Sequence, residues 1–242
     1  MLRNWNFQRP KTKTLYCPSS DSRTKASFAA HFDPMTPSPI LATFLAEGLS
    51  LRRGTRVVWD NATWSLQGPC AIVGANGSGK SSTLAMLAGQ VAPDAGNVRL
   101  ETDLGAVEPE RWMTSVSLAA PWMALPKHLT LQEALTFHGT FRTSRQGALG
   151  WQALLDASGL RVGTSVPLGQ WSSGQQQRLA LALALGTQAT AILLDEPASN
   201  LDSDGILWYQ RVLTEVSGQT TTIVATNDIE KEAPKAPSML EI

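Results

Sequence analysis

The 242-residue sequence has little of three features that often reveal a protein's class: cysteine, net charge and long apolar runs. Its two cysteines, Cys17 and Cys70, lie far apart and make no metal or redox motif, which suits a reducing compartment. The 20 basic residues equal the 20 acidic ones, so no nucleic-acid partner is expected. The longest apolar tract, Leu179 to Leu194, is broken by glycine, threonine and glutamine, which argues against a membrane span. We therefore expect a soluble protein.

What the sequence does contain is a glycine-rich stretch between an apolar run and an apolar helical pattern. It fits the nucleotide-phosphate loop pattern G-x-x-x-x-G-K-[ST] and reads Gly74, Ala75, Asn76, Gly77, Ser78, Gly79, Lys80 and Ser81. Glycines let backbone N–H groups turn inward, and the following helix N-terminus adds partial positive charge, so the stretch can cradle an anion. We expect Lys80 to contact the β- and γ-phosphates, Ser81 to offer its hydroxyl to Mg²⁺, and Ser82 to belong to the same site. A chance glycine-rich turn is the weaker alternative.

Two carboxylates follow a second apolar run. Ala191 to Leu194 reads as a buried strand, and Asp195 and Glu196 come directly after it. Ligands of open α/β sheets bind at the carboxyl ends of the strands, where this strand would deliver both side chains. Asp195 can hold Mg²⁺ directly or through water, and Glu196 can accept a proton from an attacking water, an effect worth about 10²–10⁴ in rate. The alternative is an acidic pair that caps a helix.

A third stretch opens a long apolar helix expected from Gly174 to Leu185, and it reads Trp171-Ser172-Ser173-Gly174-Gln175-Gln176-Gln177-Arg178. Taken alone, it is a helix N-terminus with a serine cap and a polar first turn. Functionally, Ser172, Gly174 and the helix N-terminus form a second phosphate-binding end, about ninety residues after the first. The two ends need not act on the same nucleotide.

Strands and helices alternate along the chain, which predicts an α/β fold. The β-like stretches are Ile40 to Leu49, Val57 to Leu66, Pro69 to Val73, Asn97 to Glu101, Ala191 to Leu194, Thr221 to Thr226 and Met239 to Ile242. The helical patterns are Ser81 to Gly89, Leu131 to Phe141, Trp151 to Leu155, Gly174 to Leu185 and Ser203 to Val216. The stretch from Trp112 to Ser165 shows no β alternation and reads as an inserted helical lobe.

The first residues differ from the rest of the chain. Between Met1 and Asp33, six basic residues stand against two acidic ones, serine and threonine are frequent, and no apolar periodicity is present. This composition is compatible with a transit peptide, but a disordered tail or a misplaced start, with Met35 as the true first residue, is favoured. We therefore expect residues 1–38 to be a disordered or mis-assigned extension and residues 39–242 to be the folded domain, with a helical lobe at about residues 112–172.

The three motifs occur in an informative order, and the acidic pair is followed by Pro197 and then Ser199-Asn200-Leu201-Asp202. From Ile40 to Ile242 the chain thereby resembles the ATP-binding subunit of an ABC transporter. The resemblance implies a P-loop NTPase core of the RecA-like type, with an N-terminal antiparallel β-subdomain and an inserted α-helical lobe. It also implies ATP and Mg²⁺ as ligands.

The resemblance further implies a head-to-tail homodimer. In that dimer Ser172, Gly174 and Gln175 of one subunit would close on the γ-phosphate held by the phosphate loop of the other, and Asp202 would lie at the seam. The helical lobe would contact a membrane permease subunit, which would hold this cytoplasmic subunit on the cytoplasmic face of the membrane.

The sequence departs from the family pattern at several positions. Trp171 and Ser173 replace the leucine and first glycine of the signature, and Val116 to Trp122 lacks the glutamine that links the lobe. Arg53 stands where an aromatic residue stacks on adenine, and its planar guanidinium can stack instead. Asn227 replaces the switch histidine. The pattern looks like a divergent bacterial branch related to the heme-exporter type.

Two functions follow from these motifs and departures. The first is an ATPase that drives transport through a permease, which Glu196 favours because it supplies a base. The second is a degenerate nucleotide switch that binds ATP and dimerises but hydrolyses slowly, which the missing glutamine and histidine favour. We favour the ATPase, with Asn227 sensing the γ-phosphate beside Glu196. The alternative for Asn227 is that it caps a short helix starting near Asp228.

Overall fold

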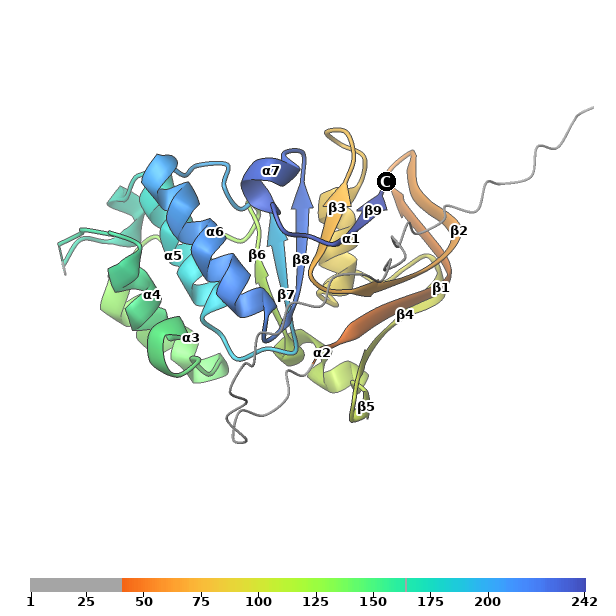
Figure 1. The fold of residues 1–242 in the computed structure, drawn as a ribbon, viewed down its shortest axis with the longest axis horizontal. Coiled ribbons are helices and arrows are strands. Elements are labelled where there is room, and N and C mark those ends of the chain that lie inside the picture. The colour runs from red at the N-terminus through yellow and green to blue at the C-terminus, as the bar shows by residue number, and fades with distance from the viewer. Residues whose placement is uncertain (1–40, 164) are drawn as a thin grey trace, which may run out of the picture.

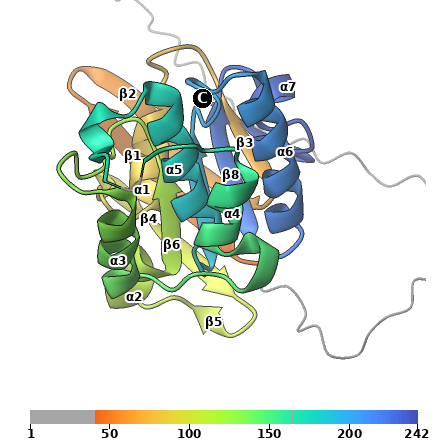
Figure 2. The same ribbon diagram turned by 90° about the vertical axis from the view of Figure 1, so that its left-hand side faces the viewer.

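The computed structural model describes residues 41–163 and 165–242, so the expectations for residues 1–38 lie outside the described residues. The described chain forms two β-sheets, with helices packed between them and beside them (Figures 1 and 2). The predicted α/β fold with an N-terminal antiparallel β-subdomain is confirmed.

The first sheet is antiparallel and combines strands from before and after the phosphate loop. In spatial order its strands are β2 (Arg56–Gln67), β1 (Thr43–Arg53), β4 (Ala95–Thr102) and β5 (Gly105–Ala106). Buried residues alternate with more exposed ones in the first half of β1, as expected for a sheet that covers a core with one face. A two-residue turn joins β1 to β2, so Arg53 lies directly opposite Arg56.

The second sheet is parallel and carries the motif loops. In spatial order its strands are β6 (Val116–Ala119), β7 (Ala191–Asp195), β8 (Thr221–Thr226), β3 (Cys70–Val73) and β9 (Ser238–Glu241). Every residue of β7 and β8 is buried because helices cover both faces of the sheet. Such burial explains why β7 reads as an unbroken apolar run rather than an alternating one.

Seven α-helices lie among the described residues, with two short 3₁₀ helices at Gly147–Leu149 and Leu168–Gln170. They are α1 (Lys80–Leu87), α2 (Pro109–Ser115), α3 (Leu131–Phe141), α4 (Trp151–Ala157), α5 (Ser173–Leu185), α6 (Ser203–Ser217) and α7 (Ile229–Glu232). Helices α3 and α4 lie away from the antiparallel sheet, at the left of Figure 1.

Two apolar clusters hold these layers together. Leu84 and Leu87 of α1 pack between the sheets against Phe44 of β1 and Ile72 of β3, and all four side chains are fully buried. Helices α4, α5 and α6 pack with the other face of the parallel sheet in the second cluster, where Leu181 is fully buried. Full burial of each such side chain is worth about 1.5–3 kcal/mol, so these clusters fix where the motif loops emerge.

The expectation that no strand lies between Trp112 and Ser165 is wrong. Val116–Ala119 forms β6, which pairs in parallel with Ala191–Leu194 of β7. The strand has four residues and three of them are buried, so it is too short to show alternation. Trp112 belongs to α2, where its indole N–H donates to the carbonyl oxygen of Leu87 at 2.7 Å.

Candidate nucleotide site

The phosphate loop, the acidic pair and Asn227 meet at one edge of the parallel sheet. Strands β7, β8 and β3 are neighbours and run in the same direction, so the loops that follow them emerge together (Figure 1). A hollow of about 490 Å³ lies at this edge, and its lining includes Gly74, Ala75, Asn76, Thr226 and Asn227. The phosphate loop, the acidic pair and Asn227 therefore lie together at this edge of the sheet.

The phosphate loop is shaped by glycine and pressed against the antiparallel sheet. Gly79 is the N-cap of α1 and has a φ of 116°, a backbone angle that residues other than glycine rarely adopt. A Cβ atom at this position would lie 2.3 Å from Cγ1 of Val58 in β2, so any side chain here would clash with Val58. The buried hydroxyl of Ser78 has no hydrogen-bond partner within the described part of the chain.

Lys80 is a buried cation, 5% exposed, whose three ammonium protons all have acceptors. Its Nζ donates to the carbonyl oxygens of Gly74 at 2.8 Å and Ala75 at 3.2 Å, and to Oδ1 of Asn227 at 2.6 Å. These oxygens hold the ammonium at the loop. A bound phosphate would have to take over at least one of the three protons.

Asp195 and Ser81 offer the oxygens that suit Mg²⁺. The Ser81 hydroxyl donates to Oδ2 of Asp195 at 2.6 Å, while Oδ1 of Asp195 is buried and without a partner among the described residues. Burial raises the pKa of Asp195, as does the charge of Glu196, while the Ser81 hydrogen bond and the charge of Lys80 lower it. A hydroxyl and a carboxylate with a free oxygen beside a phosphate loop fit a hard divalent cation.

Glu196 is held in an unusual backbone conformation at the end of β7. Its φ is +44°, in the left-handed region that few non-glycine residues adopt, and such conformations persist where the surrounding structure enforces them. The backbone N–H of Glu196 donates to the carbonyl oxygen of Ala225 in β8 at 2.9 Å. The side chain is partly exposed, and its Oε1 accepts from Nδ2 of Asn227 at 3.2 Å.

Asn227 connects the phosphate loop to Glu196. Its Oδ1 accepts from Lys80, and its Nδ2 donates to Oε1 of Glu196 at 3.2 Å and to Oδ1 of Asn76. The alternative in which Asn227 caps a helix is wrong, because Asp228 is the N-cap of α7 and its carboxylate accepts from the backbone N–H of Lys231. The Asn227 side chain is thus free of a capping role.

The second anion-binding end has the predicted serine cap. The Ser172 hydroxyl accepts from the backbone N–H of Gln175 at 3.2 Å, and the Gln175 side chain accepts from the backbone N–H of Ser172 at 2.9 Å. These two bonds form a capping box at the start of α5. A Cβ atom on Gly174 would lie 2.8 Å from the carbonyl oxygen of Asn200, so the helix start lies tightly against the loop after Glu196.

The start of α5 faces a hollow of its own. This hollow is about 480 Å³ and is lined by Ser172, Ser173, Gly174, Gln175, Arg178, Gly159, Leu160, Arg161, Asn200 and Asp202. It shares no lining residue with the hollow at the phosphate loop. Arg178 forms an ion pair with Asp202, whose carboxylate also accepts from Gly205 to cap α6.

Arg56 lies beside the phosphate loop and is a residue that the sequence analysis did not single out. Nη1 of Arg56 would lie 3.4 Å from a Cβ atom placed on Gly77 of the loop, whereas the predicted Arg53 donates to the carbonyl oxygen of Arg52. The register explains both positions, because Arg53 and Arg56 face each other at the tip of the β1–β2 hairpin. The sequence does contain a signal for Arg56, because a turn that contains Gly54 separates it from Arg53 and so places the two arginines opposite each other.

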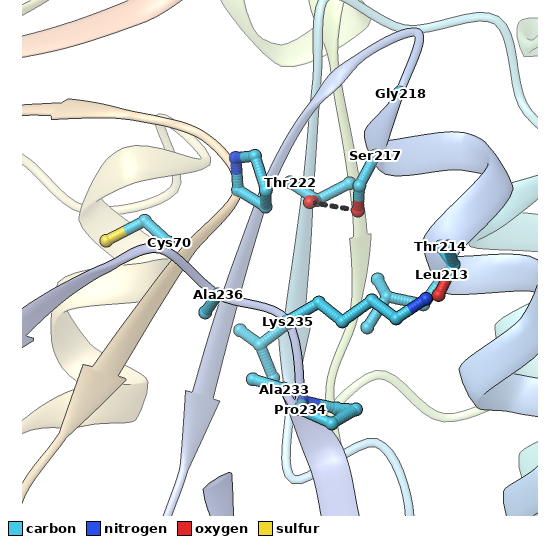
Figure 3. Close-up of a pocket in the computed structure, with 12 residues that line it drawn as sticks. Cys70, Leu213, Thr214, Ser217, Gly218, Thr222, Ala233, Pro234, Lys235 and Ala236 are labelled. Carbon is cyan, nitrogen blue, oxygen red and sulfur yellow. Dashed lines mark hydrogen bonds between the residues drawn. The ribbon is translucent and has the colours of Figure 1, made fainter. Parts of the chain in front are cut away.

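A more enclosed hollow lies away from this chemistry. It is about 250 Å³ and sits between the end of α6, the starts of β3 and β8, and the residues after α7 (Figure 3). Two of its hydroxyl groups, those of Ser217 and Thr222, lie 2.7 Å apart and form a hydrogen bond, and the Lys235 side chain extends toward α6. None of the phosphate-loop, acidic-pair or signature residues lines it, so the nucleotide site is assigned to the sheet edge.

None of the helices among residues 41–163 and 165–242 combines the length and apolar character needed to cross a bilayer.

Comparison with known proteins agrees with this geometry. The family described as ABC transporter matches residues 62–199, more than half of the chain. Over 162 residues the chain is 36% identical to the cytochrome c biogenesis ATP-binding export protein CcmA of Rhizobium meliloti, covering 65% of this chain and 77% of that protein. Over 202 residues it is 31% identical to the aliphatic sulfonates import ATP-binding protein SsuB of Burkholderia ambifaria, covering 82% of this chain and 60% of that protein.

The fold has solved counterparts. A putative ABC transporter ATP-binding protein from Pyrococcus furiosus superposes with a TM-score of 0.66 at 16% identity, covering 82% of this chain and 96% of that one. At this identity the likeness shows the fold alone. Several relatives are named for cytochrome c biogenesis export, which agrees with the placement near the heme-exporter branch.

Proposed function

The chain belongs to the ABC transporter family, and on that premise we propose that it works as a homodimer that binds MgATP between its subunits and drives a membrane permease. As a member of this family the chain is an ABC-type ATPase. The arrangement of its two anion-binding ends supports the dimer: the phosphate loop and the start of α5 face hollows that share no residue. One subunit therefore does not enclose a nucleotide by itself, whereas two subunits placed head to tail would.

The phosphate loop would bind the polyphosphate. Backbone N–H groups of the loop and of the first turn of α1, where Ser81 and Ser82 lie, would donate to phosphate oxygens. Lys80 would exchange its carbonyl acceptors for the β- and γ-phosphates, since a hydrogen bond to a charged oxygen is stronger than one to a neutral carbonyl. Arg53 would stack on the adenine from the β1–β2 hairpin.

Ser81 and Asp195 would hold Mg²⁺ between the loop and the acidic pair. The ion would neutralise charge on the phosphates and help orient them. Oδ1 of Asp195 is buried and has no hydrogen-bond partner among the described residues, and the bound ion would supply a positive charge beside it.

Glu196 and Asn227 would carry the hydrolytic step. Glu196 would accept a proton from the water that attacks the γ-phosphorus, and the bond from that phosphorus to the ADP oxygen would break. Asn227 donates to Glu196 and accepts from Lys80, so it lies between the base and the group that contacts the γ-phosphate. A triphosphate that draws Lys80 away would free Oδ1 of Asn227 and let its amide turn toward the γ-phosphate. This geometry favours hydrolysis over the slow nucleotide switch.

An exposed apolar surface supports docking on a permease. Phe137 and Phe141 of α3 are 54% and 66% exposed, and their rings lie edge to face 5.5 Å apart. The next residue, Arg142, donates to the carbonyl oxygens of Met113 and Thr114, so the end of α2 with the exposed Met113 lies beside them (Figure 2). Exposed apolar groups gathered in this way mark interaction sites. We propose that this surface contacts the permease at the cytoplasmic face of the membrane.

Mixing two inactive variants tests the dimer. Lys80→Ala removes the phosphate-loop cation, and Ser172→Asp keeps a good helix cap but places a negative charge where the γ-phosphate would bind. Each variant alone should lose ATP turnover. A mixed dimer would contain one intact site, made from the phosphate loop of the Ser172→Asp subunit and the signature of the Lys80→Ala subunit. ATPase activity that reappears on mixing supports the proposal; a mixture as inactive as its components contradicts it.

A further inference from the structure

Glu232 is a buried carboxylate that the steps above do not use. It is the last residue of α7 and is 5% exposed, although Glu230 and Lys231, which precede it, reach solvent. A buried carboxylate costs several kcal/mol unless hydrogen bonds compensate, so its partners carry information about what it does.

Both partners of the Glu232 carboxylate lie beside the hydrolytic residues. Its Oε1 accepts from the backbone N–H of Ala198 at 2.9 Å, two residues after Glu196. The hydroxyl of Thr226, the residue before Asn227, donates to the same carboxylate. One buried group therefore joins the loop that carries Glu196 to the strand end that carries Asn227.

The loop after Glu196 needs such support. Glu196 has a φ of +44°, a conformation that persists only when the surroundings enforce it. The Gln177 side chain of α5 holds this loop from one side by donating to the carbonyl oxygen of Pro197 at 2.7 Å. Glu232 holds it from the other side through Ala198, which is fully buried.

We propose that Glu232 is a positioning residue for ATP hydrolysis, whose carboxylate fixes the Glu196 loop against the Asn227 strand end. The inference rests on the proposed function, because it needs Glu196 to act as the base. Burial and the nearby charge of Glu196 raise the pKa of Glu232, while its bonds to Thr226 and Ala198 lower it. The two hydrogen bonds thus stabilise the charged form of the carboxylate, whereas burial and the negative charge of Glu196 destabilise that form.

The first test compares two substitutions at this position. Glu232→Ala should lower kcat about tenfold while KM for ATP stays within about twofold, because the phosphate loop keeps its contacts. Glu232→Gln should restore kcat to within about threefold of the parent, because the amide oxygen can still accept from Ala198 and the NH₂ can donate to Thr226. Equal, large losses of kcat in both variants would overturn the inference, as would a normal kcat in Glu232→Ala.

Tyr209→Phe separates positioning from stability. The Tyr209 hydroxyl donates to the backbone carbonyl oxygen of Glu232 at 2.6 Å, so this variant weakens the anchoring of α7 without touching the carboxylate. It should lower the melting temperature and leave kcat unchanged well below that temperature. A fall in kcat matching that of Glu232→Ala would show that Glu232 acts only through stability, which overturns the inference.

A double-mutant cycle asks whether Glu232 acts through Glu196. Single-turnover hydrolysis of MgATP should be no slower in Glu196→Gln with Glu232→Ala than in Glu196→Gln alone, because there is no base left to position. Losses that multiply would contradict the inference while leaving the proposed function intact. Parent-level turnover in Glu196→Gln alone would overturn the proposed function and the inference together.

Discussion

Oδ1 of Asn227 lies 2.6 Å from Nζ of Lys80, although 147 residues separate the two in sequence. Nδ2 of the same amide donates to Glu196, so a single uncharged side chain connects the phosphate-binding cation to the base. Histidine, which the family pattern has at this position, changes its charge near neutral pH, whereas asparagine does not. The connection in this protein is therefore independent of protonation at residue 227.

Asn227→Ala should lower kcat by about ten- to a hundred-fold with little change in KM for ATP, since a hydrogen bond to a charged group is worth about 1.5–3 kcal/mol. Asn227→His should be tolerated or faster. Steady-state ATPase kinetics measure both. The melting temperature of Asn227→Ala should stay close to that of the parent, because Asp228 and not Asn227 caps α7.

Asp228→Ala is the matched control for Asn227. It removes the α7 cap and should cost about 1 kcal/mol of stability with a nearly normal kcat. If instead Asn227→Ala shows the lowered melting temperature and an unchanged kcat, the sensing role of Asn227 is refuted.

Arg56→Ala should weaken nucleotide binding by about tenfold through loss of a charge-assisted contact beside Gly77. The affinity for inorganic tripolyphosphate should fall by the same factor as the affinity for ATP, because the guanidinium of Arg56 lies at the phosphate loop. Arg52→Ala removes the same charge from β1, one position before Arg53, which is the residue paired with Arg56. Successive residues of a strand face opposite sides of a sheet, so this variant should have little effect. Equal affinities in the two variants, measured by calorimetry, would rule out a special role for Arg56.

Phe137→Glu combined with Phe141→Glu should abolish docking without harming the ATPase. Both rings are exposed, so the charges cost little folding stability, yet they cannot be buried against an apolar partner surface. The measurement is the fraction of subunit that sediments with membranes of cells containing the intact transporter. Leu207→Glu, also at an exposed apolar residue, is the control and should sediment like the parent. Normal sedimentation of the phenylalanine variant would place docking elsewhere.

His138 gives the stability of the fold a pH dependence of known sign. Burial, aided by the charge of Arg142, lowers the pKa of His138 from 6.5 to about 4. Thr187 gives its proton to the carbonyl oxygen of Leu183, so Nε2 of His138 donates to the Thr187 hydroxyl. It is burial and the charge of Arg142, rather than this bond, that make the folded state favour the neutral ring. The unfolded state binds more protons between about pH 4 and 6.5, so the free energy of unfolding should fall as pH drops through that window.

His138→Gln should remove this part of the pH dependence, about 1–2 kcal/mol after discounting for partial exposure. Denaturant unfolding at pH 4.5 and 7 measures it. His128→Gln is the control, because His128 is exposed. In this variant the change in the free energy of unfolding between the two pH values should match that of the parent. An unchanged slope in His138→Gln would show that other groups cause the dependence.

The sequence predicted the parts of the site that depend on local order along the chain. The phosphate loop, the acidic pair and the Ser172 cap each lie within a few residues, so spacing alone indicates the chemistry. Strand β6 was not predicted, because four mostly buried residues show no alternation of apolar and polar side chains. Arg56 and Glu232 were not predicted as site residues. The position of Arg56 depends on the register of the hairpin, and that of Glu232 depends on a contact between loops distant in sequence, neither of which a sequence pattern contains.

Glu196→Gln is the variant that tests the account most directly. The amide keeps the shape of the carboxylate but cannot act as base, so the variant should bind MgATP, fail to hydrolyse it, and accumulate as an ATP-bound dimer. Size-exclusion chromatography with and without MgATP, alongside an ATPase assay, measures both properties. The account predicts a nucleotide-dependent shift to dimer with turnover lost. A monomer that hydrolyses ATP at the parent rate would contradict it.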